Sequence, residues 1–368
     1  MDASPARHDE PTFDFYDRCA NAVIGSVRDN LEAWFSRYPS GDHRRDLLGR
    51  LRDGDRRQWG SAVWELYVHE ALRRFGFDIT PHPHLSTTTR RIDFLATRGE
   101  ERVFVECAIV THSDEAAARR GGIAALEAAI DKSGILDYWL DLQFERIGPT
   151  SIPPEPFVEA LRAWVVAQDI EALDAVARQG ILGLPSFDWD QDGWLARVWA
   201  IPRTAELRGR EDIRPLGIMA GEDDEKSVWL ALKAAMESKA TAYGELDAPF
   251  IIAVNAPDAW PSDGEAIWAA FGTHAFTDAW ERDGFLLRNG GPSYPGVSGV
   301  LIGVAVQPIS LPRRWPTLYE NPSAEMPVPE SLRWARVRVE DDSPLRLQGI
   351  DPPALFDVAP DWPGVPWP

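Results

Sequence analysis

Cysteine and lysine are scarce in this chain of 368 residues, and their scarcity excludes several classes of protein. There are two cysteines, Cys19 and Cys107, which excludes a disulfide-rich secreted scaffold. Nearly every basic residue is an arginine, because lysine occurs only four times. No apolar run approaches the ~20 residues that cross a bilayer, and the first residues are polar rather than a secretory signal. We therefore expect a cytoplasmic protein without a membrane partner.

The balance of charge is strongly acidic. The chain has 58 acidic and 38 basic residues, a formal net charge of −20, while its 44% hydrophobic content is that of a globular protein. Affinity for nucleic acid usually comes from a basic surface that displaces counterions from the phosphates. The net charge therefore disfavours non-specific binding to nucleic acid, although a local basic groove stays possible.

Two strand-like runs, residues 91–96 and 102–108, each carry one carboxylate among apolar neighbours. A polar turn separates them, so the pattern predicts a β-hairpin that brings Asp93 and Glu106 together. Two converging carboxylates are typical ligands of Mg²⁺ or Mn²⁺. Without a cation their mutual repulsion is unfavourable unless they are solvated or protonated.

The order of predicted elements indicates an α/β fold. Apolar residues at helical spacing predict a helix over residues 59–75, ahead of the hairpin, and another over residues 225–243. A fully apolar strand at residues 249–255 follows the second helix, and a further buried strand is predicted at 297–307. Because hairpins and crossovers alternate, the sheet should be mixed and flanked by helices.

The chain divides into a core, an insertion and two extensions. The core is expected at residues 57–132 and 223–307, interrupted by an inserted α+β region at 133–222. Residues 1–56 read as an N-terminal helical extension whose last part, from residue 42, is charged and linker-like. Residues 308–368, rich in proline and tryptophan, are expected to form an irregular C-terminal extension.

The carboxylates and the elements that carry them resemble the PD-(D/E)XK, or restriction-endonuclease-like, nucleases. Members have a helix with an inward glutamate, an aspartate at the first hairpin strand, and Glu-x-Lys on the second strand. Glu65, Asp93 and the Glu-Cys-Ala sequence at 106–108 stand at these places. Residues 239–244 and the strand at 249–255 are similar to the second helix and fourth strand of such cores.

The resemblance implies a restriction-endonuclease-like core and a metal-dependent reaction. Asp93, Glu106 and Glu65 would hold Mg²⁺ or Mn²⁺, with the backbone carbonyl of Cys107 as a further ligand. His69, one helical turn after Glu65, is a candidate for contact with these ligands. The ion would activate water and stabilise the charge on the phosphate under attack.

One departure from the family pattern divides the functional interpretation. Ala108 stands where the family has its lysine. Either the site is inactive and kept for binding, or a lysine from another element replaces the missing one. Lys239 is the favoured replacement and Lys233 the second candidate, whereas Arg119 and Arg120 would serve as a phosphate clamp.

Two functions from different classes follow. The first is a divalent-metal-dependent nuclease that hydrolyses phosphodiester bonds in DNA or RNA, with Asp93, Glu106 and Lys239 as catalytic residues. The second is a catalytically inactive nuclease-fold module that acts as a binding or scaffold protein. A zinc site at His82, His84 and His112 lacks ligands at suitable spacing. The sequence leaves open whether the chain forms a homodimer.

Overall fold

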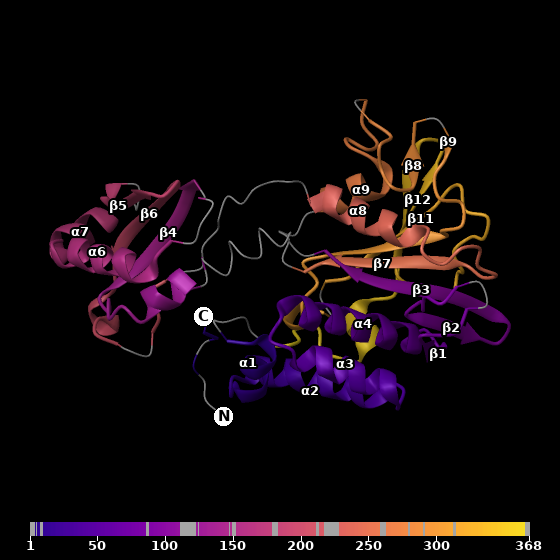
Figure 1. Ribbon diagram of the computed structural model, residues 1–368, viewed down its shortest axis with the longest axis horizontal. Helices are drawn as coiled ribbons and strands as arrows, with labels where there is room; N and C mark the ends of the chain where they lie inside the picture. Colours follow the sequence, from indigo (N-terminus) through magenta and orange to yellow (C-terminus); the bar gives the residue numbers. More distant parts are fainter. Residues whose placement is uncertain are drawn as a thin grey trace. The chain divides into compact units, whose positions relative to one another are not determined.

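The fold is that of a computed structural model (Figure 1). It describes residues 4, 6–7, 10–85, 88–110, 123, 125–146, 148, 152–178, 183–210, 213–216, 228–257, 263–278, 280–289, 291–311 and 314–364. The chain forms two compact units. The larger unit comprises residues 1–3, 11–111 and 226–368, and the smaller comprises residues 4–10 and 112–225.

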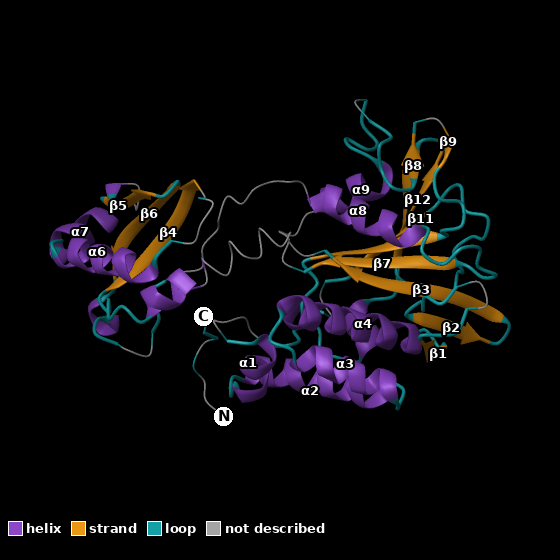
Figure 2. Ribbon diagram, in the orientation of Figure 1, coloured by secondary structure: helices purple, strands orange, loops and turns teal. Residues whose placement is uncertain are grey.

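A mixed sheet of eight strands, in the order β1-β2-β3-β7-β10-β11-β12-β13, forms the larger unit (Figure 2). Its strands are β1 (Asp78–Pro81), β2 (Phe94–Arg98), β3 (Glu101–Ile109), β7 (Phe250–Ala256), β10 (Gly299–Val304), β11 (Thr317–Glu320), β12 (Ala335–Glu340) and β13 (Ser343–Leu347). Strands β3, β7 and β10 run parallel, whereas β1, β2 and β3 pair antiparallel. Every residue of β7 is buried, because a central parallel strand is covered on both faces.

Helices cover both faces of this sheet (Figure 1). Helix α4 (Arg56–Arg74) packs on one face, with α1 (Thr12–Arg18), α2 (Ala22–Arg37) and α3 (Asp42–Arg52) beyond it. Helices α8 (Val228–Ala240) and α9 (Asp263–Phe271) pack on the other face. Side chains alternate between the faces, so Val105 of β3 meets the α4 layer and Phe104 meets the α8 layer. The predicted mixed sheet flanked by helices is confirmed.

Helix α4 begins and ends where the sequence signals it. Asp55 caps the N-terminus by accepting a hydrogen bond from the backbone N–H of Arg57. Gly76 follows the helix with a φ of +90°, a left-handed conformation that favours glycine. The helix predicted over residues 59–75 is therefore present and begins three residues earlier.

Two expectations for the larger unit are wrong. Residues 42–52 are not a linker but helix α3, because Leu47 and Leu51, one turn apart, bury an apolar stripe beneath a charged surface. Residues 308–368 are not irregular, since β11, β12 and β13 extend the central sheet. These strands have four to six residues each, too short to show a clear period between prolines.

The remaining elements are short. A two-stranded ribbon joins β8 (Leu287–Arg288) to β9 (Gly291–Pro292). Single-turn 3₁₀ helices occur at Ala205–Leu207 and Pro308–Ser310, and helix α10 covers Pro352–Phe356. None of the described helices has the length and apolar character that a bilayer crossing requires.

The described part of the smaller unit contains a three-stranded antiparallel sheet, helices α6 (Pro154–Val166) and α7 (Ile170–Ala177), and a helical segment at residues 125–131. Its strands β4 (Tyr138–Arg146), β6 (Trp194–Pro202) and β5 (Ser186–Gln191) lie in that order. Burial alternates strictly along β6, as expected for a sheet with one face on a core. Helices α6 and α7 are separate, because the side chain of Asp169 caps the N-terminus of α7.

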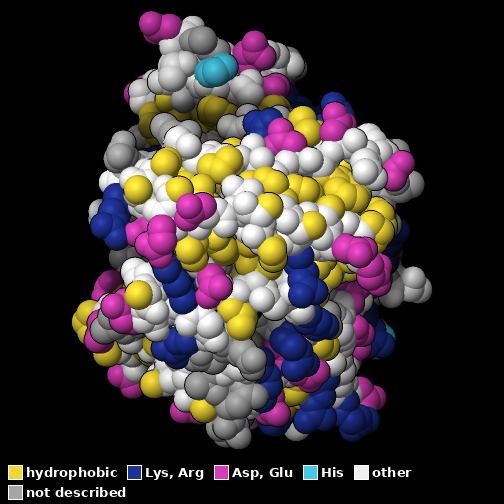
Figure 3. Space-filling model, turned by 90° about the vertical axis from the view of Figure 1, so that its left-hand side faces the viewer, with side chains coloured by type: hydrophobic (Ala, Val, Ile, Leu, Met, Phe, Trp, Pro, Cys, Tyr) yellow, Lys and Arg dark blue, Asp and Glu magenta, His cyan; other side chains and the backbone are white. Residues whose placement is uncertain are grey.

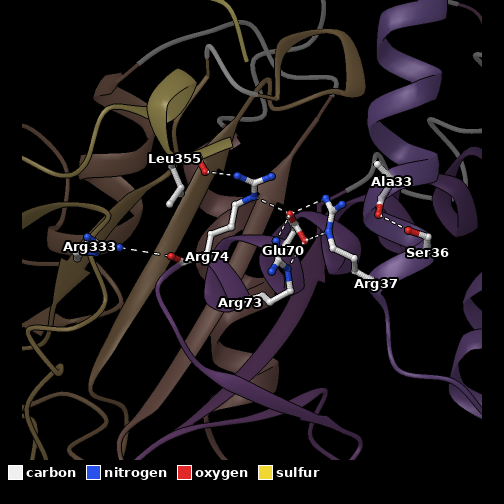
Figure 4. Close-up of polar contacts among 8 residues, drawn as sticks. All are labelled: Ala33, Ser36, Arg37, Glu70, Arg73, Arg74, Arg333 and Leu355. Carbon is white, nitrogen blue, oxygen red and sulfur yellow. Dashed lines mark hydrogen bonds and ion pairs between the residues drawn. The ribbon is translucent and has the colours of Figure 1, made fainter. Parts of the chain in front are cut away.

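A buried ion cluster ties α2 to α4 in the larger unit (Figure 4). Glu70 is fully buried and accepts hydrogen bonds from the guanidinium groups of Arg37, Arg73 and Arg74, at donor–acceptor distances of 2.6 to 3.3 Å. Burial opposes ionisation of Glu70, but the three guanidinium groups outweigh it and lower its pKa to about 2. The carboxylate therefore stays charged at neutral pH.

Replacing this carboxylate by an amide should destabilise the protein. We expect Glu70→Gln to lower the free energy of unfolding by about 2 to 4 kcal/mol near neutral pH, because three guanidinium groups lose their common partner. Urea unfolding measures this, with the exposed Glu171→Gln, paired to Arg208, as the control that stays within about 0.5 kcal/mol.

The same variant has a pH signature. The folded-state pKa of Glu70 is depressed, so its stabilisation is full above the ordinary value of 4.5 and is lost as the pH falls toward about 2. The difference between wild type and Glu70→Gln should therefore shrink at about pH 3. A difference that is unchanged or larger in acid would contradict the ionised cluster.

Candidate functional site

An open cavity of about 550 Å³ lies where β2 begins, between the hairpin and α8. It is lined by His82, Arg90, Arg91, Asp93, Glu106, Ser238, Lys239, Ala242 and Tyr243. Three of these residues are the catalytic residues that the sequence predicts, and they come from three separate segments of the chain.

The hairpin brings Asp93 and Glu106 together. Residue Phe94 of β2 pairs with Val105 of β3, so Asp93 sits just before β2 and next to Glu106. The backbone N–H of Asp93 donates to Glu106 Oε2 at 3.3 Å, and the N–H of Cys107 donates to Asp93 Oδ2 at 2.7 Å. These two bonds fix both carboxylates at one end of the hairpin.

Lys239 completes this arrangement from the other side of the cavity. Its Nζ lies 2.6 Å from Glu106 Oε1, and the Glu106 side chain is only 3% exposed. Ala108 lies two residues after Glu106 and therefore on the same face of β3. Helix α8 packs on that face and supplies an ammonium group to the carboxylate that the family motif would pair with its strand lysine.

The electrostatics of the three groups are coupled. Burial raises the pKa of Asp93 well above its ordinary value, and the charges of Glu106 and Glu65 raise it further, against the N–H of Cys107 and the charge of Lys239. Burial lowers the pKa of Lys239, but Glu106 outweighs burial and raises it. Lys239 is therefore a cation, and Asp93 lacks a positive partner strong enough to compensate for its burial.

The charge of Glu65 acts on Asp93, but the Glu65 carboxylate is hydrogen-bonded to residues outside the cavity lining. It projects from α4 and accepts a hydrogen bond from the Tyr38 hydroxyl at 2.7 Å and one from Arg50 Nη2 at 2.6 Å. The two bonds reach different carboxylate oxygens, so both oxygens have a donor. Binding an ion directly through Glu65 would require release from Tyr38 or Arg50.

His69 lies behind this network rather than in the cavity. Its ring packs against Tyr38 at 4.8 Å and Phe94 at 5.9 Å between centroids. Burial, with the charges of Arg73 and Arg37, lowers the pKa of His69 to about 4, so the ring is neutral. It supports the tyrosine that holds Glu65.

The other predicted candidates lie away from the cavity or beyond the described residues. Lys233 donates to the backbone carbonyl of Asp283 and lies 5.8 Å from the ring centroid of Trp229. It is absent from the cavity lining. Arg119, Arg120 and the zinc candidate His112 fall outside the residues that the structure describes.

The lining also contains residues that the sequence did not place at this site: Arg90, Arg91, Ser238, Ala242, Tyr243, and His82, which the sequence suggested only for zinc. Tyr243 lies four residues after Lys239, just beyond the end of α8, and its hydroxyl donates to the carbonyl of Arg91 at 3.4 Å. Burial, then the charge of Glu106, raises the pKa of Tyr243 above its usual range. The adjacent Arg90 and Arg91 precede Asp93 directly, so their place in sequence was an available signal.

The backbone of His82 explains its position in the lining. Its φ is +46°, which is uncommon and strained for a residue with a side chain. The His82 N–H donates to the Asp93 carbonyl at 2.8 Å, which places imidazole Nδ1 3.8 Å from Asp93 Oδ1. The strain is thus offset by contact with a central residue of the site.

Comparison with known proteins adds no family. No protein-family model, curated protein or solved structure matches this chain. Across the described ranges, no three His, Cys, Asp or Glu side chains gather as a metal-binding group on their own. The site is therefore defined by its geometry: a buried and a half-buried carboxylate, one lysine and two arginines around an open cavity of an α/β protein.

Removing the charge of Asp93 should stabilise the metal-free protein. The folded-state pKa of Asp93 is raised, so stability is lost as the pH rises above the ordinary value of 3.8. We expect Asp93→Asn in EDTA at neutral pH to be more stable than wild type, because the amide removes a charge that burial and two nearby carboxylates disfavour.

Chemical denaturation checks this, with Asp247→Asn as the control. The hydrogen bond from Arg102 lowers the pKa of the exposed Asp247, so that variant should gain nothing. Loss of stability in Asp93→Asn would show that Asp93 is an ordinary structural residue.

Proposed function

We propose that this chain is a divalent-metal-dependent nuclease that hydrolyses phosphodiester bonds in DNA or RNA. The observation that carries the proposal is the contact of 2.6 Å between Lys239 and Glu106, in a cavity shared with Asp93. It supplies from α8 the lysine that Ala108 removes from β3. The resemblance to PD-(D/E)XK nucleases then extends to the chemistry of the site as well as to the order of elements.

The oxygen atoms of the site fit a hard cation. Asp93 and Glu106 both line the cavity, and Asp93 Oδ1 lies 3.8 Å from His82 Nδ1. Glu106 Oε2 accepts a hydrogen bond of 3.3 Å from the backbone N–H of Asp93, and the Tyr243 hydroxyl also binds the Glu106 carboxylate. A residue on one edge of a strand directs its N–H and C=O to the same side, so the Cys107 carbonyl points to the side where its N–H meets Asp93. Carboxylate and carbonyl oxygens with water are the ligands of Mg²⁺ and Mn²⁺.

The protein groups have separate tasks in this proposal. A bound Mg²⁺ or Mn²⁺ would lower the pKa of a water molecule and polarise the phosphate. Lys239, held as a cation by Glu106, orients water or stabilises negative charge and does not act as a base. Arg90 and Arg91, on the rim, attract and orient the phosphate.

The pairing of the carboxylates also supports the second candidate function, an inactive nuclease-fold module that binds or scaffolds. Glu106 is neutralised by Lys239, and Glu65 by Arg50. Each pair satisfies a buried charge without any cation, as a purely structural site does. The two functions differ in what they require of Lys239.

Substitution of Lys239 separates them, with Lys233 as the matched control on the same helix. We expect Lys239→Gln to reduce cleavage of single- and double-stranded DNA and RNA in Mn²⁺ or Mg²⁺ by about 10²- to 10⁴-fold, the range for a positioned catalytic group. Lys233→Gln should keep wild-type activity, because Lys233 contacts Asp283 and not the cavity.

A lysine on the strand should restore what is lost. In the double variant Ala108→Lys, Lys239→Ala, the ammonium returns to the face of β3 that carries Glu106, so part of the cleavage should recover. Absence of cleavage by the wild-type protein with either metal, or full activity of Lys239→Gln, would contradict the nuclease function and favour the inactive binding module.

A further inference from the structure

The ion cluster around Glu70 holds more positive charge than it needs. Arg37, Arg73 and Arg74 each pair with Glu70, so three positive charges surround one negative charge (Figure 4). Among the described residues, no other carboxylate forms an ion pair with any of the three. The group defined by these three arginines, hereafter the arginine cluster, therefore keeps an excess of two positive charges.

The arginine cluster also keeps unused hydrogen-bond donors. Each guanidinium has five N–H groups. Arg37 and Arg73 each bind Glu70 through Nε and Nη2, and within the part of the chain that the structure describes Nη1 of both has no hydrogen-bond partner. Their side chains are 33% and 38% exposed, so both are partly accessible to solvent. The inner edges bind the carboxylate and the outer edges are open to a ligand.

The cluster is fixed in position before any ligand arrives. Arg74 binds Glu70 through Nε and the carbonyl of Leu355 through Nη1, while Arg333 donates to the carbonyl of Arg74 (Figure 4). Held guanidinium groups have already lost the rotamer entropy that binding would otherwise cost. Such a cluster is suited to phosphate, which accepts paired N–H donors from arginine.

This local excess contrasts with the acidic chain around it. The formal net charge is −20, and acidic and basic side chains are intermixed over the face drawn in Figure 3. The net charge of the chain repels phosphate. A local and fixed excess of positive charge is therefore a distinct feature of this surface.

The arginine cluster shares helix α4 with Glu65. Glu70 follows Glu65 on α4 by five residues, which is about 7.5 Å along the helix axis. Arg37 is followed directly by Tyr38, which binds Glu65. Helix α4 and the end of α2 therefore connect the cluster to Glu65.

We propose that the arginine cluster binds a backbone phosphate of the nucleic acid, away from the bond that is cleaved. The proposal rests on the proposed function for its choice of ligand. Arg73, the most exposed member, makes the main contact, and Glu70 positions all three guanidinium groups.

Binding without cleavage tests this. Fluorescence anisotropy of labelled single- and double-stranded DNA is measured in EDTA over a series of NaCl concentrations. In Arg73→Gln the slope of log affinity against log salt should become shallower by about 0.7 for single strands or 0.9 for duplex, the loss of one phosphate contact. Arg73→Lys keeps the charge and should keep the slope.

The matched control is Arg102→Gln, which removes one positive charge from an arginine of similar exposure that is paired one-to-one with Asp247. It should leave the slope unchanged. Circular dichroism confirms that each variant is folded, and Arg73→Gln still leaves Glu70 two arginine partners.

The outcomes separate this inference from the proposed function. A changed slope in Arg73→Gln supports the cluster even if the wild-type protein cleaves nothing. An unchanged slope, or no binding of DNA by the wild-type protein, overturns it even if cleavage is found. Binding to vesicles of anionic phospholipid in place of DNA, with the same dependence on Arg73, also overturns it.

Discussion

The ion pair between Lys239 and Glu106 is the interaction on which the site depends. A glutamate that is 3% exposed needs a partner, because a buried charge without one is unfavourable. By meeting that need, Lys239 joins α8 to β3 and places an ammonium group beside the hairpin. The same contact fixes Glu106 next to Asp93 and raises the pKa of Lys239, so the lysine acts as a cation.

The site is assembled from both faces of the sheet, which meet where β2 begins. Helix α8 contributes Lys239 and α4 contributes Glu65, held by Tyr38 and Arg50. Asp93 stands between them as the carboxylate whose burial is least compensated. Perturbed groups of this kind concentrate at functional sites. The cluster around Glu70 ties α4 to α2.

Much of this arrangement could be predicted from the sequence, because it depends on local patterns. The turn between two apolar runs defines the hairpin, and helical periodicity places Lys239 at the edge of a buried stripe. Some pairings between distant segments could not be predicted. The partner of Glu65 was hidden because α3, which carries Arg50, reads as a charged linker, and His82 depends on an unusual φ that no pattern signals. Strands β11 to β13 were too short to show a period.

The most direct test of the account is a crystal structure of the wild-type protein soaked in Mn²⁺, with anomalous diffraction used to locate the ion. The account predicts an anomalous peak about 2.0 to 2.6 Å from Asp93 Oδ1 and a Glu106 oxygen, with Lys239 still beside the site. If the cavity shows no peak at saturating Mn²⁺ while the pair of Glu106 and Lys239 is unchanged, the metal-dependent nuclease is contradicted.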